Sequence, residues 1–272
     1  MAEMTEKIEL LGKNVYKDIP GVITLKSIPT SSELDYVGAE DFDVTMVEKI
    51  LPESVEEKID FKKLLYIDYQ WICRGLRFLN YGPYHTISLI YCPDCNLIRE
   101  DFQIDMRSVE VLPLPPDMKS AQIRIKKDEF IDFDQDIIIM LPTVQQVLDS
   151  RKDNMFARPD GSRDNKLARL CHMVVQIGDT FVTSIETYGV IKNKMTPADF
   201  KILDGVSKEL TNYGLRNGGR CKCPKCGNPD ASFIAPSDDL FFRPSLGDLR
   251  KWKSDRNSKR EEDTTGIKTT TV

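Results

Sequence analysis

The sequence predicts an α+β fold, in which helices and short antiparallel strands surround a split four-cysteine zinc knuckle. Apolar residues recur at helical spacing through residues 61–79, and alternation with a period of two follows Pro83. The motif CPxC occurs twice, at 92–95 and at 223–226. The chain has 272 residues, of which 40% are hydrophobic and 30% charged, enough for a globular body with its own core.

Residues 1–60 form the first predicted region, which is acidic and interrupted by prolines. Its stretch IPGVITLKSIPTSSELDY (19–36) predicts a short strand among loops. The stretch DVTMVEKILPES (43–54) predicts a helix that stops near Pro52.

Residues 61–250 form the predicted α+β body. A helix over 61–79 should end at the turn NYGP, and two strands over 86–91 and 98–104 should place the first CPxC at a hairpin tip. Two further strands are expected at 120–130 and 136–141, with helices over 143–152, around 167–174, and after Thr196 as N-cap, stopping near Gly214. Residues 251–272 are charged and then threonine-rich, so we expect a mobile tail.

Catalytic motifs are absent from the sequence, which has no phosphate-binding loop, dinucleotide fingerprint or nucleophile elbow. The acidic clusters EDFD (40–43) and DEFIDFDQD (128–136) lack the spacing of a calcium-binding loop, so we expect solvated loops. The net charge of −5 disfavours nucleic acid and anionic membranes, and no apolar run is long enough to span a bilayer. The sequence therefore favours a protein that is not an enzyme.

The two CPxC motifs predict one shared metal site. Two thiolates separated by two residues can reach a tetrahedral zinc ion from one turn, and Gly227 allows a left-handed step after the second turn. Backbone N–H groups in such turns can point at the sulfurs. Closing the chain between the motifs costs about 4 kcal/mol in its length-dependent term, against roughly 10–16 kcal/mol for structural zinc. We therefore predict that Cys92, Cys95, Cys223 and Cys226 bind one structural zinc ion.

The other cysteines and the histidines have weaker alternatives. Cys221 could replace Cys223, although only Cys223 reproduces the CPxC motif, and Cys73 and Cys171 lie in helices as small core residues. His172 fits a helix core, and His85 could support a metal ligand. Unmetallated turns, redox use or a site shared with another chain remain open for the CPxC cysteines. With no secretion signal, we expect reduced thiols and the cytoplasm.

The order of these features resembles the baseplate hub proteins of T-even-type contractile-tailed bacteriophages, including those needed for hub assembly. An amphipathic helix, LLYIDYQWICRGLRFLNYG, runs into a strand, the knuckle YCPDC and then FQIDMRSVEVLPLP; ARLCHMVVQIG, the second CPxC and FIAPSDDLFFRPS follow. The likeness covers roughly residues 10–250, whereas Cys221 matches no part of it. The residues that carry it on the helix, turn and first knuckle are Leu64, Leu65, Asp68, Leu76, Arg77, Tyr81, Gly82, Cys92, Pro93 and Cys95.

The resemblance implies a non-enzymatic structural or assembly protein of the tail baseplate hub, held in shape by zinc. Its partners would be other baseplate hub and tail proteins, in the host cytoplasm during assembly, and whether it stays in the virion is open. One alternative is a zinc-ribbon accessory factor that binds nucleic acid through a basic face. That face would comprise Arg220, Lys222, Lys225, Arg243 and Arg250. The other alternative is a dithiol oxidoreductase, which needs a cysteine with a lowered pKa.

Overall fold

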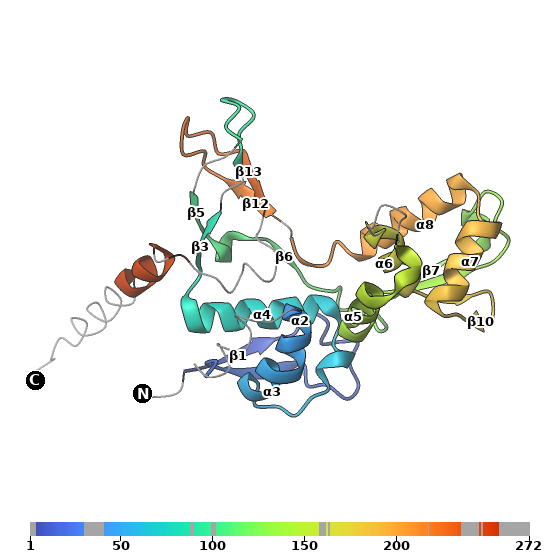
Figure 1. The fold of residues 1–272 in the computed structure, drawn as a ribbon, viewed down its shortest axis with the longest axis horizontal. Helices are drawn as coiled ribbons and strands as arrows, with labels where there is room; N and C mark the ends of the chain where they lie inside the picture. Colours follow the sequence, from blue (N-terminus) through green and yellow to red (C-terminus); the bar gives the residue numbers. More distant parts are fainter. Residues whose placement is uncertain are drawn as a thin grey trace, which may run out of the picture.

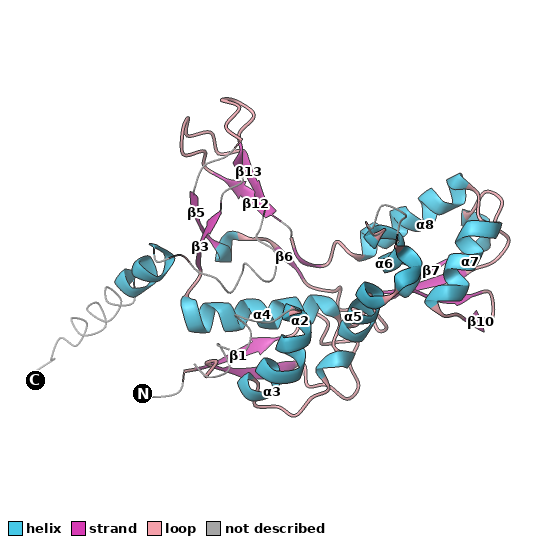
Figure 2. Cartoon of the chain, in the orientation of Figure 1, coloured by secondary structure: helices cyan, strands magenta, loops and turns pink. Residues whose placement is uncertain are grey.

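The computed structural model describes residues 4–29, 41–87, 90–98, 102–157, 162, 164–216, 218–234, 245 and 247–255. The α+β prediction is confirmed: helices and short strands are mixed along the chain, and the strand pairs are antiparallel (Figures 1 and 2). Two large hydrophobic cores meet at one long helix, α4 (Tyr66–Tyr81). This helix therefore links the parts of the molecule.

The N-terminal part packs a hairpin and an interrupted helix against α4. Strands β1 (Thr5–Glu9) and β2 (Val22–Lys26) pair antiparallel, although the sequence indicated only β2. The helix consists of α2 (Phe42–Thr45), a π-helical turn (Met46–Ile50) and α3 (Leu51–Ser54). It ends at Ser54, in agreement with the predicted stop near Pro52, and this proline lies in the first turn of α3. There its missing N–H removes no hydrogen bond within α3.

Helix α4 begins later than the apolar pattern predicts. Residues Phe61–Lys63 form a 3-10 turn capped by Asp60, and Leu64 and Leu65 are extended. The Tyr66 N–H donates to the carbonyl of Pro142 at 2.9 Å, so contacts with a distant segment fix the start of the helix. The helix ends as predicted, at Gly82, whose φ of 75° favours glycine.

A hairpin and a three-stranded sheet extend above α4 in Figure 1. Strands β3 (Tyr84–Ile87) and β5 (Phe102–Asp105) pair with each other, which confirms the predicted hairpin in part; residues 99–101 of its second strand lie outside the described residues. Strand β4 (Ile90–Tyr91) instead pairs with β13 (Ala231–Ile234), and β13 pairs with β12 (Gly218–Cys221). The sheet thus joins two segments that are far apart in the sequence. A 3-10 turn (Met106–Ser108) and the β6 (Val111–Leu112) pairing with β11 (Gly214–Leu215) continue the chain toward the second core.

The second core lies in the lobe on the right of Figure 1. Its sheet has the order β10-β9-β8-β7; helices α6 and α8 contact this sheet, and α5 and α7 pack against α6. The elements are β7 (Gln122–Ile125), β8 (Ile137–Met140), α5 (Val144–Lys152), α6 (Asn165–Met173), β9 (Val174–Ile177), β10 (Thr180–Phe181), α7 (Ser184–Lys194) and α8 (Pro197–Leu210), with 3-10 turns at Lys127–Glu129 and Asn154–Phe156.

Most elements of this lobe agree with the prediction, but three were not predicted. Strands β7 and β8 and helices α5, α6 and α8 are present, and Thr196 caps α8 by accepting from the Asp199 N–H. The β9–β10 hairpin and α7 were missed. Helix α8 ends at Leu210 rather than near Gly214, and its C-cap, Thr211, departs from helical backbone geometry with ψ of 1°.

A helix over residues 247–255 docks on the β3–β5 hairpin. Its Asp248 is fully buried and accepts hydrogen bonds from the Thr86 hydroxyl at 2.9 Å and the Gln103 amide at 2.7 Å. Burial alone would raise the pKa of Asp248, but these and other hydrogen bonds outweigh it and lower the pKa. Trp252 packs so closely on Gly82 that a Cβ there would lie 2.3 Å from its indole ring.

The helix over 247–255 includes the first residues of the segment that was predicted to be a mobile tail. The first residues of that segment, 251–255, are helical, and Lys251 Nζ lies 4.2 Å from the ring centroid of Tyr84. The Tyr84 hydroxyl also donates to Asp255. Residues 256–272 lie outside the described residues.

Candidate metal centre

The first CPxC knuckle is positioned by strand β4. Cys92 directly follows this strand, and its N–H donates to the Leu97 carbonyl at 2.9 Å, which closes the turn. Asn96, immediately after Cys95, has a left-handed backbone with φ of 51°. Asparagine is one of the few residues other than glycine that adopt this conformation readily.

The second knuckle repeats this construction after strand β12. The Cys223 N–H donates to the Asn228 carbonyl at 2.7 Å, and Gly227, immediately after Cys226, has φ of 78°. The left-handed step predicted at Gly227 is therefore present. Asn96 is its counterpart in the first knuckle, and sequence reasoning missed it. The signal was available, because CPDCN and CPKCG place an asparagine and a glycine at the same position.

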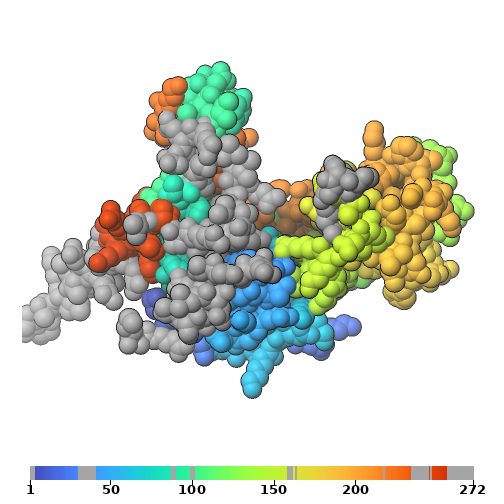
Figure 3. Space-filling model, viewed as in Figure 1, coloured from blue at the N-terminus to red at the C-terminus, as the bar shows by residue number. Residues whose placement is uncertain are grey.

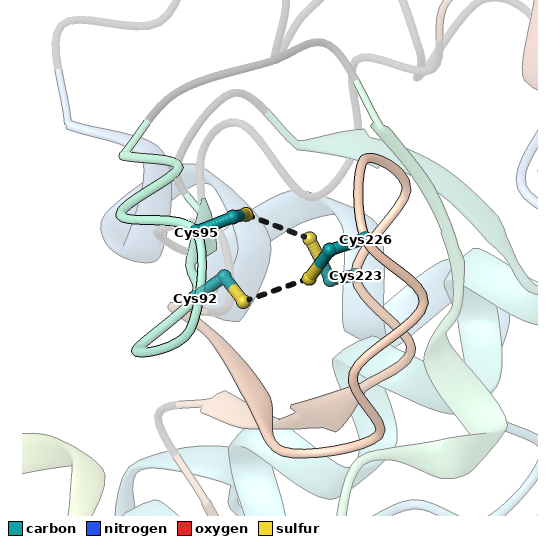
Figure 4. Close-up of side chains that lie close together, drawn as sticks. All are labelled: Cys92, Cys95, Cys223 and Cys226. Carbon is teal, nitrogen blue, oxygen red and sulfur yellow. Dashed lines mark hydrogen bonds between the residues drawn. The ribbon is translucent and has the colours of Figure 1, made fainter.

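The two knuckles bring four sulfurs together (Figure 4). Cys92 Sγ lies 3.5 Å from Cys226 Sγ, and Cys95 Sγ lies 3.7 Å from Cys223 Sγ, although 128 positions separate this second pair. All four sulfurs are within 4.8 Å of one another. A tetrahedral zinc ion with zinc–sulfur bonds of about 2.3 Å requires sulfurs about 3.8 Å apart. The four cysteines therefore fit a single tetrahedral metal ion, and they are the one such group among the described residues.

The surroundings of the sulfurs act differently on the thiols. Burial raises the pKa of Cys95. The Asn228 N–H favours the thiolate of Cys226, but burial and the neighbouring sulfurs raise its pKa to about 12. Cys223 is instead held toward the thiolate form that a metal requires. The N–H groups of Cys226 and Lys225 donate to Cys223 and lower the pKa of its thiol to about 6. Cys92 and Cys223 are buried, whereas Cys226 is exposed. Backbone groups thus point at the sulfurs as the sequence predicted, and one side of the site faces solvent.

The remaining cysteines do not join this group. Cys221 lies in β12, packs beside the four cysteines and is half-buried; burial raises the pKa of its thiol. The structure therefore places Cys223, and not Cys221, opposite the first knuckle. Cys73 and Cys171 are buried in α4 and α6, as expected for core residues. Burial raises the pKa of the Cys171 thiol to about 12.

Neither histidine lies in the sulfur cluster. His85 is buried on β3, and burial, with the nearby positive charge of Arg77, lowers its pKa. Among the described residues, no hydrogen bond joins His85 to any of the four cysteines, so its expected support of a metal ligand is not seen. His172 lies in α6 near Asp153, with its Nε2 3.8 Å from the carboxylate.

Asp68 is a structural residue of the N-terminal part. It is fully buried and accepts from the N–H groups of Leu11 and Gly12, at 2.5 Å and 3.2 Å, and from the Tyr16 hydroxyl at 2.5 Å. Burial raises the pKa of Asp68. Its carboxylate therefore fixes the loop after β1 to α4, which is a local structural role.

Arg77 holds the end of α4. Its guanidinium is buried and donates to the carbonyls of Gly82 and Tyr84, at 2.6 Å and 2.7 Å. Asp68 and Arg77 thus bind different parts of the backbone, and each has a local structural role.

The basic residues around the second knuckle are partly engaged. Arg220 pairs with Asp230 at 3.0 Å, which reduces the positive charge available for nucleic acid. Arg243 lies outside the described residues.

Comparisons with protein-family models, curated protein sequences and solved structures found no match. None of the described helices combines the length and apolar character that crossing a membrane requires.

Proposed function

We propose that the chain is a zinc-stabilised assembly protein of a contractile-tail baseplate hub. The observation that carries this proposal is the convergence of four cysteines from two distant knuckles within 4.8 Å. Four thiolates occupy every position of a tetrahedral zinc ion, so such an ion would shape the chain and offer no position to a substrate. The hub itself is proposed from the resemblance of the helix, knuckle and following strand.

The surface around the first knuckle supports a role in protein association. Tyr91 is 50% exposed and Ile98 is 63% exposed, and they flank the knuckle on either side. Figure 3 shows the knuckle segments, one green and one orange, together at one extremity of the molecule. Exposed aromatic and aliphatic side chains on a projecting, metal-held segment suit contact with another protein.

The lowered pKa of Cys223 also meets one requirement of the oxidoreductase alternative. Reactive CxxC pairs, however, lie at the start of a helix, whereas both CPxC motifs here form turns after a strand. A thiolate is equally the form that zinc requires. The turn geometry supports metal ligation over dithiol chemistry.

Co-purification tests the proposal. The tagged chain, co-expressed with the baseplate hub proteins of a T-even-type phage, should retain at least one of them. The double variant Tyr91→Ser/Ile98→Ser should weaken retention by about tenfold, because it removes two apolar contacts. The control Val22→Ser changes a residue of similar exposure on β2 and should bind normally.

Failure of every hub protein to co-purify would refute the hub assignment. DNA binding that weakens steeply with salt would instead identify a nucleic-acid accessory factor.

A further inference from the structure

A cavity of about 380 Å³ lies where the two large cores meet. Its walls come from the start of α4, from α5 and α6, and from the segment that joins α8 to β11. This volume falls in the range of small-molecule sites, and the cavity is separate from the cysteine cluster.

The chain is built to hold these segments together. The Pro142 carbonyl accepts from the Tyr66 N–H, and Leu65 bridges to Thr143, which joins α4 to the approach to α5. On the other side, Gly214 has φ of 96°, and a Cβ there would lie 2.8 Å from Ile67 Cγ2. A glycine is therefore required for β11 to approach α4. The cavity thus has walls fixed by backbone contacts.

One wall holds an arginine whose position is fixed by a buried carboxylate. Arg151 Nη2 lies 2.5 Å from Asp43 Oδ2, and Asp43 is only 2% exposed. The Tyr69 hydroxyl donates to the other oxygen of Asp43, and Tyr66 also contacts this carboxylate. The predicted solvated loop at 40–43 is therefore wrong for Asp43, which is buried because its charge is paired. The pair orients Arg151 and cancels much of its charge.

A second arginine on the cavity wall has no carboxylate partner among the described residues. This residue, Arg169, is exposed on α6. Gln70, Asn165 and Thr211 add hydrogen-bonding groups, and none of the lining residues is acidic. The whole chain has more acidic than basic residues, so its composition does not explain why acidic residues are absent from the cavity lining.

Another wall of the cavity is apolar. Leu141, Pro142, Val147 and Leu215 line the same cavity. A ligand that fits must therefore combine a negative group with an apolar part.

We propose that this cavity binds a small organic anion with a flat or compact apolar portion. Arg169 holds the carboxylate or phosphate group, and the apolar portion lies against Leu141, Val147 and Leu215. The site would exist whether or not the chain acts in a baseplate hub.

Isothermal titration of the full chain tests this with benzoate and phenyl phosphate as probes. Benzylamine has a similar shape and the opposite charge, and inorganic phosphate has the charge without the apolar part. We expect saturable binding of one or both aromatic anions at roughly millimolar concentration or below, and weaker binding of the two controls.

Three variants locate the site. Arg169→Gln removes an exposed charge without disturbing the core, and Gln70→Glu places a carboxylate in the cavity at nearly constant volume. Each should weaken binding of the aromatic anion by about tenfold or more, since a charge-assisted hydrogen bond contributes roughly 1.5–3 kcal/mol. Arg250→Gln, at another exposed arginine on the helix over 247–255, should leave binding unchanged.

The proposal is overturned if neither aromatic anion binds. It is also overturned if benzylamine binds equally well, or if Arg169→Gln and Gln70→Glu both bind as the unaltered chain does. Inorganic phosphate binding as tightly as phenyl phosphate would show that the apolar wall contributes nothing.

Discussion

The strongest prediction concerns the split metal site and the change Cys95→Ser. We expect the unaltered chain to hold one zinc ion per molecule and the variant to lose it, because a serine hydroxyl is a poor zinc ligand at neutral pH. Cys223→Ser, in the other knuckle, should behave in the same way. Cys221→Ser is the matched control, since Cys221 lies beside the site and outside the set of four sulfurs within 4.8 Å.

The size of the effect follows from the separation of the knuckles. Closing a loop of 128 positions between Cys95 and Cys223 costs about 4 kcal/mol in its length-dependent term. Structural zinc contributes roughly 10–16 kcal/mol, so at least about 6 kcal/mol remains to stabilise the knuckles. The small cluster here buries only Cys92, Cys223 and Ala231, whereas each large core has its own apolar residues. Loss of zinc should therefore open the three-stranded sheet locally and leave the rest folded.

Elemental analysis and amide hydrogen exchange measure the two parts of this prediction. Exchange in β12 and β13 should accelerate by about ten-thousandfold or more in Cys95→Ser, which corresponds to at least about 6 kcal/mol, while α8 stays protected. Zinc retained in Cys95→Ser, or lost from only one of the two knuckle variants, would refute a single shared site. Zinc lost from Cys221→Ser would show that the four ligands are wrongly assigned.

Three further predictions concern the scaffold. Gly82→Ala should lower the melting temperature, because φ there is 75° and the new Cβ would lie 2.3 Å from the Trp252 indole; Gly189→Ala, with nothing within 4 Å, should instead stabilise by about 0.5–1 kcal/mol, and calorimetry of both variants checks this. Asp248 has a lowered pKa in the folded chain, so its stabilisation is full above the ordinary value near 4 and is lost as the pH falls through the folded value; Trp252 fluorescence should report release of the helix over 247–255 in acid, and Asp248→Asn should release it at neutral pH without that dependence. Asp68→Ala should cost about 2–5 kcal/mol in urea unfolding because two backbone amides and a tyrosine hydroxyl lose their acceptor, and a cost below about 1 kcal/mol would contradict the role assigned to it.

Local sequence signals predicted much of the fold. The α8 cap at Thr196 and the end of α4 at Gly82 depend on residues within one turn, and both were found as expected. The start of α4 depends on a hydrogen bond from Tyr66 to Pro142, far along the chain. The spacing of apolar residues over 61–79 gives no information about this bond. Strand β4 pairs with β13 rather than with its neighbour in sequence for the same reason.

The candidate site was predictable to the extent that its geometry is local. Each CPxC turn follows from its own residues, so the four cysteines could be identified together. From the sequence, only the CPxC motif excluded Cys221 from the set of metal ligands. In the structure, strand β12 places Cys223, and not Cys221, opposite the first knuckle. The cavity could not be predicted at all, because Tyr66, Arg151, Arg169 and Leu215 share no local pattern and meet only where the two cores join.

The three-stranded sheet buries little apolar surface near the knuckles, which explains why a metal would be needed there. Ile90 and Phe233 join the sheet to the first core, yet nearer the knuckles only Ala231 and the cysteines are buried together. So little apolar surface cannot offset the entropy of ordering both turns. A metal ion can, because its bonds do not depend on buried area. With a metal bound, the segment that carries the exposed Tyr91 and Ile98 would project from the body and still be rigid, as the proposed assembly surface requires.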